Sequence, residues 1–348
     1  IYADVRDVLD KKTVPFRIGD LKGAASIKYA IEVYDEETQK KAILKMFRLE
    51  SIAHTRAEFN LLEFMSNYLV KKHGTKYGIF RSVVRASRAA VERELVVTDE
   101  VKKSLAANRY IYINQNEEGI SVRAPVEALV ADRAILSEYA EGSSFFSLRE
   151  DIQPIVAKKL LQMEAQNLFA QKPFVLFDPD RHAGNYRIHV QDFNGQPHIV
   201  IEDVKGTEDV EVNAIDMGQL LKLQASEREL IIELFAISQM LKGVGPNAYL
   251  VDHLSNIYKM SDKQKKTLMQ QLNVYYPDKK GKEITAYFAL LAALETAEVR
   301  IPITYFDFVR AIIQLQQYEP FVPKVRDWQT PSEMFISQVK LKASGILP

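Results

Sequence analysis

The stretch LFDPDRHAGN, residues 176–185, sets charged and polar residues directly behind an apolar, strand-like run. Asp180 and Asn185 stand five positions apart, and another acid, Asp216, ends a later strand-like run in NAIDMGQ. Transfer of a phosphoryl group from a nucleotide needs a carboxylate beside the acceptor hydroxyl and oxygen ligands that hold magnesium against the phosphates. The three residues supply that set, although each alone is more often an ordinary loop or cap residue.

Such chemistry also needs a cation for the phosphates, and Lys45 is the candidate. It lies in KKAILKMF, an apolar strand-like run, where a lysine is costly unless a carboxylate pairs with it. The helical segment that follows offers Glu58 and, as second choice, Glu63, and neither spacing decides between them. Alone, Lys45 is more often a solubility residue of an edge strand.

Hydrophobic periodicity predicts strands first and helices later. Residues 14–47 read as a three-strand meander, and residues 54–74 as an amphipathic helix. Short strands return over 110–140, and a helical period follows over 147–169. Further strands are predicted in YRIHV, HIVIEDV and VEVNAI, and the chain is mostly helical from Leu220 onward.

Composition bounds the class of protein. The chain has 348 residues, 47% of them hydrophobic, so it can bury a sizeable core in two lobes or domains. The chain has 46 Lys and Arg residues and 46 Asp and Glu residues, so no positive net charge indicates nucleic acid as a partner. The absence of cysteine excludes disulfides and zinc–thiolate sites. No apolar run reaches the length of a membrane span, so we expect a soluble, cytosolic protein, although an N-terminal address stays open.

In their order along the chain, these parts resemble the protein-kinase-like superfamily: a Gly-containing turn, a strand lysine, a helix glutamate, a hinge, a catalytic loop and a metal aspartate. The resemblance runs from about residue 14 to about residue 220. It implies an α+β, bilobal fold with an antiparallel-sheet N-lobe, a mainly helical C-lobe and extra C-terminal helices. The corresponding division is 1–140 for the N-lobe, 141–225 for the start of the C-lobe and 226–348 for the helical remainder.

The resemblance also implies roles for single residues. Asp180 is the expected catalytic aspartate, Lys45 the lysine that binds the phosphates of ATP, and Glu58 the residue that orients this lysine. Asn185 and Asp216 are the expected ligands of Mg or Mn. Further ATP contacts are expected from the turn GDLKGAAS and the hinge LSEYAEG, namely from Gly23, Ala24, Ser26, Glu138, Tyr139 and Ala140.

The acceptor of the phosphate is less well defined by the sequence. The turn lacks the pattern G-x-G-x-x-G, and no standard activation loop follows Gly218. The motif D-R-H-x-x-N, together with I-D-x-G, is most similar to the motifs of phosphoinositide kinases. The mixed pattern as a whole resembles remote kinases among secreted bacterial effectors of Legionella type. We expect transfer to a protein Ser/Thr hydroxyl, in an effector injected into a host cytosol. A phosphoinositide kinase, a pseudokinase scaffold and a small-molecule kinase remain alternatives, and a long C-terminal acceptor pocket would be the sign of the last.

A basic segment over residues 71–93 contains a single acid, Glu92. If it is helical, its arginines share one face, which suits an inositol polyphosphate as activator, a phosphoinositide headgroup or a phosphoprotein; the alternative is a solvated basic face. The predicted anion site consists of Lys71, Lys72, Lys76, Arg81, Arg85 and Arg88. Lysines at 279, 280 and 282 offer a peripheral contact with an anionic membrane surface, although core packing of these helices is the more common reading.

Overall fold

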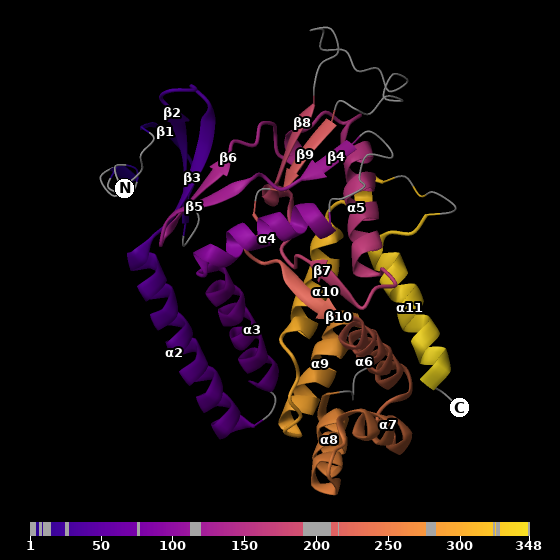
Figure 1. Ribbon diagram of the computed structural model, residues 1–348. Helices are drawn as coiled ribbons and strands as arrows, with labels where there is room; N and C mark the ends of the chain where they lie inside the picture. The colour runs from indigo at the N-terminus through magenta and orange to yellow at the C-terminus, as the bar shows by residue number, and fades with distance from the viewer. Residues whose placement is uncertain are drawn as a thin grey trace.

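The computed structural model describes residues 5–6, 9, 15–24, 28–74, 77–111, 120–190, 210–214, 216–275, 283–322, 324 and 328–346. Strands dominate the first part of this chain and helices the second (Figure 1). This arrangement confirms the predicted α+β class, with an antiparallel sheet followed by a mainly helical region. The finer division into three segments stays a prediction.

A five-stranded antiparallel sheet forms the N-terminal part, in the strand order β1-β2-β3-β6-β5. Its strands are β1 (Phe16–Ala24), β2 (Lys28–Asp35), β3 (Lys41–Phe47), β5 (Glu127–Ala131) and β6 (Ala134–Glu138). The first three are the predicted meander. Along β3, Leu44 and Met46 pack into one core cluster, whereas Phe47 belongs to another cluster, with Val97. Because side chains alternate along a strand, Lys45 lies on the same face as Phe47.

Three helices connect β3 to the next strand. They are α2 (Leu49–His73), α3 (Gly78–Glu94) and α4 (Val97–Tyr110). The first two form an antiparallel pair that reaches away from the sheet, with α3 beside α9 (Figure 1), whereas α4 packs against β5 and β6. The sequence predicted a helix over 54–74, and it treated 71–93 as a conditional helix. It did not predict α4.

The remaining strands form two small sheets. The pair β7 (Phe174–Phe177) and β10 (Leu221–Gln224) is antiparallel. The order β4-β9-β8 joins β4 (Ile120–Arg123), β9 (Val210–Ala214) and β8 (Tyr186–Val190), with β4 parallel to β9. Residues 178–185, which we call the catalytic-loop stretch after the resemblance, therefore connect β7 to β8. Asp216 follows β9. Residues 221–224 are a strand rather than the predicted start of a helix, because they pair with β7. The predicted strand HIVIEDV lies outside the described residues.

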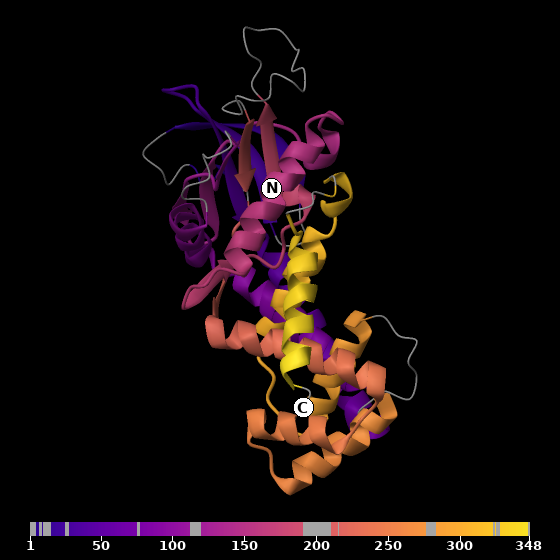
Figure 2. The ribbon, with the colours of Figure 1, turned by 90° about the vertical axis from the view of Figure 1, so that its right-hand side faces the viewer.

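Helices make up most of the rest of the chain. They are α5 (Gln153–Leu168), α6 (Ala225–Val244), α7 (Ala248–Tyr258), α8 (Asp262–Tyr275), α9 (Glu283–Thr296), α10 (Thr304–Leu315) and α11 (Pro331–Ile346), with short 3-10 turns η3 (Phe145–Ser147), η4 (Ala183–Asn185) and η7 (Glu319–Phe321). The largest apolar core lies among them, and α6 to α9 gather at the end far from the sheet (Figure 2). No helix in the described part of the chain is long and apolar enough to cross a membrane. The lysines at 279, 280 and 282 are not among the described residues.

Candidate active site

Lys45 is held by two carboxylates on the α4 side of the sheet. Its Nζ lies 3.0 Å from Oε1 of Glu100 on α4 and 2.6 Å from Oε1 of Glu127 on β5. The side chain of Lys45 is 12% exposed and that of Glu100 is 1% exposed. Burial lowers the pKa of Lys45, but the two carboxylates outweigh it and raise that pKa above its usual value. The lysine is therefore charged, as binding of phosphate requires.

The structure corrects the predicted partner of Lys45, which is neither Glu58 nor Glu63. Glu58 is exposed on α2, and Glu63 pairs with Arg88 of α3. The reason is geometric: α2 follows β3 in sequence but packs on α3, so α4 is the helix that meets the lysine face of the sheet. Glu100 takes the place that the sequence assigned to Glu58.

A second lysine extends this network to Asp216. Lys28, at the start of β2, lies 2.7 Å from Oε2 of Glu100 and 3.9 Å from Oδ2 of Asp216. Burial lowers the pKa of Lys28, but the charges of Asp216 and Glu100 raise it overall. Lys103 of α4 donates to the carbonyl oxygen of Gly218 over 2.7 Å. Helix α4 therefore positions both the lysines of the sheet and the turn that carries Asp216.

Asp216 is ionised at neutral pH. Its side chain is 38% exposed, and its Oδ1 accepts the backbone N–H of Gly218 over 2.9 Å. Partial burial raises the pKa of this carboxyl, but the charges of Lys28 and Lys45 and the hydrogen bond from Gly218 lower it to about 2. A carboxylate so stabilised is a suitable ligand for a hard cation.

A buried arginine, Arg181, fixes the catalytic-loop stretch in place. Arg181 is 1% exposed, and its guanidinium lies 3.1 Å from Oε1 of Glu164 on α5 and 3.7 Å from Oδ2 of Asp178. Asp178 in turn accepts the backbone N–H of Asp180 over 2.7 Å. Burial raises the pKa of both carboxyls, which the arginine charge opposes. Through these contacts Arg181 holds the loop in place.

The carboxylate of Asp180, in that loop, contacts Arg310, which is distant in sequence. Its Oδ1 accepts a hydrogen bond from Nη2 of Arg310 on α10. Its carbonyl oxygen accepts the side-chain N–H of Asn185 over 2.8 Å, so the amide nitrogen of Asn185 is used within the loop. His182 caps η4 by accepting the N–H of Gly184 over 3.0 Å. The carboxylate of Asp180 is thus engaged by a cation that the sequence did not reveal.

A cavity of about 470 Å³ lies beside these groups, in the size range of small-molecule sites. Gly23, Glu138, Tyr139 and Ala140 line it, and their contact with ATP stays a prediction. We call it the nucleotide cavity after that prediction. Its wall also carries the residues predicted for phosphate and metal binding and three further cations: Lys45, Asn185, Asp216, Lys22, Lys28 and Arg187. Ala24 continues β1 and pairs with Tyr29, while Ser26 lies outside the described residues.

The hinge approaches β8 closely enough to require glycine. Gly142 has φ of +110°, and a Cβ there would clash with the carbonyl oxygen of Ile188. The next residue, Ser143, exchanges two backbone hydrogen bonds of 2.9 Å with Ile188. The chain that leaves the nucleotide cavity is thereby tied to the strand that follows the catalytic loop.

Asn185 and Asp216 are oxygen donors of the kind that Mg²⁺ prefers. Magnesium in phosphoryl-transfer sites is bound through one or two carboxylates together with phosphate oxygens and waters, so this pair and a nucleotide form a sufficient donor set. In the described part of the chain, no group of three or more His, Cys, Asp or Glu side chains could hold a metal ion. Asn185 and Asp216 are donors that would fit a metal held jointly with a nucleotide, and binding of Mg or Mn stays a prediction.

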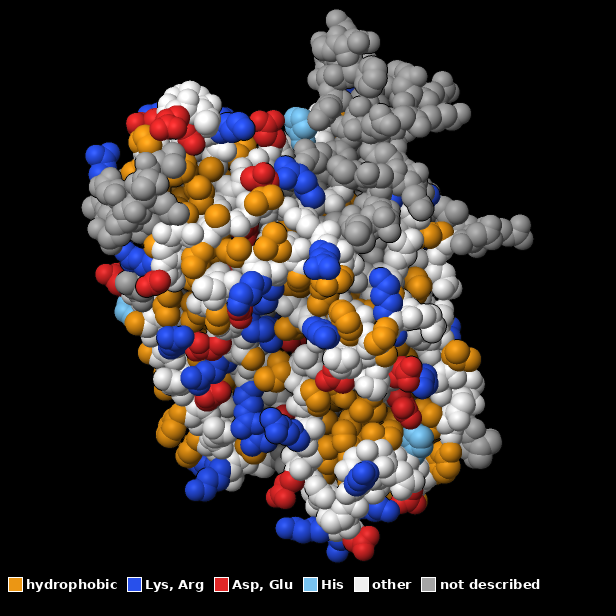
Figure 3. All heavy atoms as spheres, viewed as in Figure 1, with side chains coloured by type: hydrophobic (Ala, Val, Ile, Leu, Met, Phe, Trp, Pro, Cys, Tyr) orange, Lys and Arg blue, Asp and Glu red, His pale blue; other side chains and the backbone are white. Residues whose placement is uncertain are grey.

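The predicted anion site is not gathered into one cluster. Arg88 pairs with Glu63 of α2, whereas Arg81 lies 3.9 Å from Glu295 of α9. Arg81 and Arg85 line another cavity, of about 630 Å³, together with Arg300 and three glutamates: Glu227, Glu295 and Glu298. Lys71 and Lys72 are exposed at the end of α2, and Lys76 is outside the described residues. Figure 3 shows acidic and apolar side chains among the basic ones over α2 and α3. Binding of an inositol polyphosphate stays a prediction.

Sequence reasoning missed the residues that complete the site: Glu100, Glu127, Lys28 and Arg310. A signal existed for α4, since Asp99 and Glu100 are acidic residues of its first turn and basic residues follow them. Nothing local marks Arg310, which is 130 positions from Asp180 in sequence.

Comparison with protein-family models finds no match, and comparison with curated proteins finds none. Among solved structures, the chain is similar to Plasmodium vivax ethanolamine kinase, with a TM-score of 0.30 and 10% sequence identity. That similarity covers 99% of this chain and 85% of the other chain. At this level of similarity, the argument for function rests on the residues of the site.

Proposed function

We propose that this protein is a Mg-ATP-dependent phosphotransferase that transfers the γ-phosphate to an alcohol. The observation that carries the proposal is the wall of the nucleotide cavity, where Lys22, Lys28, Lys45 and Arg187 accompany Asn185 and Asp216. A triphosphate needs cations and metal ligands on one surface, and adenine is commonly met by hinge backbone such as that of residues 138–140.

Each residue has a definite task in the proposed reaction. Lys45 and Lys28 bind phosphate oxygens, and Glu100 keeps both lysines in place. Asn185 and Asp216 would hold Mg²⁺, which neutralises charge on the phosphates when bound. The acceptor oxygen bonds to the γ-phosphorus while the bond from that phosphorus to the bridging oxygen of ADP breaks. The hydroxyl proton passes to Asp180, once Arg310 has left this carboxylate.

The proposal is tested by following labelled γ-phosphate from Mg-ATP into acceptors, with wild type and Asp180→Asn. We expect transfer by the wild type, reduced by about 10² to 10⁴-fold in the variant, because the proton acceptor is removed. Asp252→Asn, which changes an exposed aspartate of α7 far from the cavity wall, is the matched control and should leave the rate unchanged. Equal rates for wild type and Asp180→Asn would contradict the proposed role of Asp180.

One observation favours a second candidate, a nucleotide-binding protein without turnover. Arg310 neutralises the carboxylate that would accept the proton. If ATP binds and Arg310→Ala also fails to transfer phosphate to any acceptor, this candidate is preferred. The protein Ser/Thr hydroxyl expected as acceptor from the sequence, and the secreted-effector role, stay predictions that the site geometry does not favour over other alcohols.

A further inference from the structure

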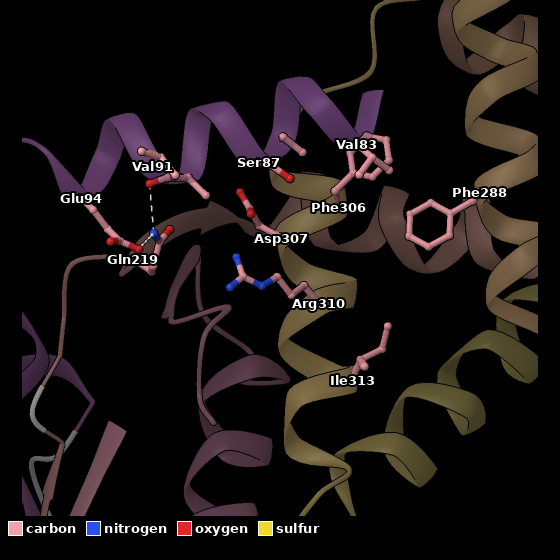
Figure 4. Close-up of a pocket in the computed structure, with 12 residues that line it drawn as sticks. Val83, Ser87, Val91, Glu94, Gln219, Phe288, Phe306, Asp307, Arg310 and Ile313 are labelled. Carbon is pink, nitrogen blue, oxygen red and sulfur yellow. Dashed lines mark hydrogen bonds between the residues drawn. The ribbon is translucent and has the colours of Figure 1, made fainter. Parts of the chain in front are cut away.

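A further cavity is lined in part by Arg310, the partner of Asp180. We call it the α3–α10 cavity, because its walls are α3 on one side and α10 on the other, with Phe288 of α9 at one end (Figure 4). Its volume is about 450 Å³, similar to that of the nucleotide cavity. Helix α3 belongs to the α2–α3 pair, which lies between β3 and α4 in sequence.

The two ends of the α3–α10 cavity differ in polarity. Val83, Phe288, Phe306 and Ile313 make one end apolar, and the two phenylalanine rings are stacked at 5.8 Å (Figure 4). Glu94 and Gln219 make the other end polar, with Asp307 and Arg310 between the ends (Figure 4). A ligand that fills this space has an apolar body and a polar head.

The polar end adjoins the groups of the proposed reaction. Arg310, which lines the cavity, also donates to Asp180. Glu94 lies against Gly218, where a Cβ would be 3.5 Å from Cγ of Glu94, 3.5 Å from Nζ of Lys28 and 3.1 Å from Oδ1 of Asp216. The α3–α10 cavity and the nucleotide cavity are therefore separated by little more than the turn at Gly218. Arg310 is the residue that connects this cavity to Asp180, the proposed proton acceptor.

Charges at this end disfavour an anionic ligand. Asp307 is paired with Arg93 over 3.0 Å, and Arg310 is paired with Asp180. Glu94 accepts a hydrogen bond from Gln219. Arg93 and Arg310 are thus already paired with carboxylates, so neither is left to pair with the phosphate of a phosphorylated headgroup.

We propose that the α3–α10 cavity is the acceptor site of the phosphotransferase, and that its ligand is a small amphiphilic alcohol without a negative charge. This assignment rests on the proposed function, because it names the acceptor for the same catalytic groups. The hydroxyl lies toward Asp180, and the apolar body lies between α3 and the Phe288–Phe306 pair. A protein or phosphoinositide acceptor does not follow from these walls.

Direct binding tests the assignment without relying on turnover. Saturation-transfer NMR compares cinnamyl alcohol with cinnamate, which share an apolar body and differ in the head. Val83→Trp fills the apolar end, and since Val83 is 45% exposed on α3 the larger ring should be tolerated by the fold. Val274→Trp, at a 60% exposed valine of α8, is the matched control. We expect a signal from the alcohol with wild type and with the control, its loss in Val83→Trp, and none from cinnamate.

Transfer from Mg-ATP to cinnamyl alcohol is then measured with the same variants. Val83→Trp should raise KM for the alcohol by about tenfold or more while leaving ATP binding unchanged. The acceptor site is overturned if the wild type gives no signal with the alcohol, or if the signal survives in Val83→Trp. Asp180-dependent transfer to another alcohol would in that case still support the proposed function. Binding of the alcohol without a phosphate ester overturns its role as acceptor. Failure of Mg-ATP to bind at all overturns the proposed function instead.

Discussion

Four charged side chains alternate in sign through the centre of the site, in the order Lys45, Glu100, Lys28 and Asp216. Isolated charges in such places are costly, and each is tolerated because the next one is opposite. The arrangement leaves two cations facing the nucleotide cavity and keeps Glu100 behind them. We therefore expect these residues to contribute to the free energy of unfolding as well as to the proposed chemistry.

Glu100→Ala should lower the free energy of unfolding by about 3 to 5 kcal/mol, because it leaves Lys28 and Lys45 buried with fewer opposite charges. Chemical denaturation followed by circular dichroism measures this. Glu58→Ala is the matched control, since Glu58 is exposed on α2 and its loss should change stability by no more than about 0.5 kcal/mol. A larger loss for Glu58→Ala than for Glu100→Ala would restore the original assignment of the lysine partner.

Asp216 should make stability depend on acid pH. Its pKa in the folded protein is about 2, below the ordinary value of 3.8, so its stabilising contribution is present above the unfolded pKa and is lost as pH falls through the folded one. The difference in unfolding free energy between wild type and Asp216→Asn should therefore move against the wild type between about pH 5 and about pH 2. A difference that stays constant over this range would show that the carboxyl titrates normally.

At the residue level, sequence reasoning reached the groups whose local surroundings are unusual. Lys45 stands out because it interrupts an apolar strand, and Asp180, Asn185 and Asp216 stand out by their spacing. The glutamate partner was wrong because pairing depends on which helix packs on the sheet, and adjacency in sequence does not decide that. Arg310 could not be predicted, since only the packing of α10 brings it to Asp180.

At the level of elements, helices α3 and α4 join the sheet to the helical region, because α4 packs on β5 and β6 and α3 packs on α9. Helix α4 holds Lys45 and Gly218, and α3 joins the helical region through Arg93, which pairs with Asp307. The apolar pattern of α2 predicted the helix correctly, but Leu62 and Met65 are exposed, so the period indicated the element and not its burial. Strands β1 to β3 were predicted well because alternation and turn residues are local signals.

Arg93→Ala should destabilise the protein by about 3 kcal/mol, because Asp307 is buried and would lose its cation. Arg56→Ala is a matched control on α2, since Arg56 forms an exposed pair with Glu92 that should contribute no more than about 1 kcal/mol. Both are measured by thermal or denaturant unfolding. Equal effects would mean that α3 is not anchored to α10 by this pair.

Gly142→Ala should destabilise the hinge by about 1 to 3 kcal/mol, because of its positive φ and the close carbonyl oxygen of Ile188. Gly243→Ala, at a position in α6 with no atom within 4 Å of the added Cβ, should instead stabilise the helix by up to about 1 kcal/mol. Unfolding midpoints of the two variants should therefore shift in opposite directions. A neutral Gly142→Ala would argue against a tight approach of the hinge to β8.

At the scale of the whole molecule, a sheet is followed by a helical region, and two of the cavities are lined by residues close to Gly218 in sequence, Asp216 and Gln219. The nucleotide cavity carries the cations of β2 and β3, and the α3–α10 cavity has one wall from helix α3. The sequence predicted the class of this fold, since strand and helix periods are segregated along the chain. The sequence could not predict the α3–α10 cavity, because its walls join residues from α3, α9 and α10 that are far apart in sequence.

The most direct test of the central claim is calorimetric titration of ATP into the protein, with and without Mg²⁺, for wild type and Asp216→Ala. The account predicts saturable binding to wild type that weakens when Mg²⁺ is removed, and a loss of that Mg²⁺ dependence in Asp216→Ala. Asp252→Ala should behave as wild type, because Asp252 pairs at the surface with Lys265. Absence of binding, or binding to wild type that is indifferent to Mg²⁺, would contradict the claim that this cavity holds Mg-ATP.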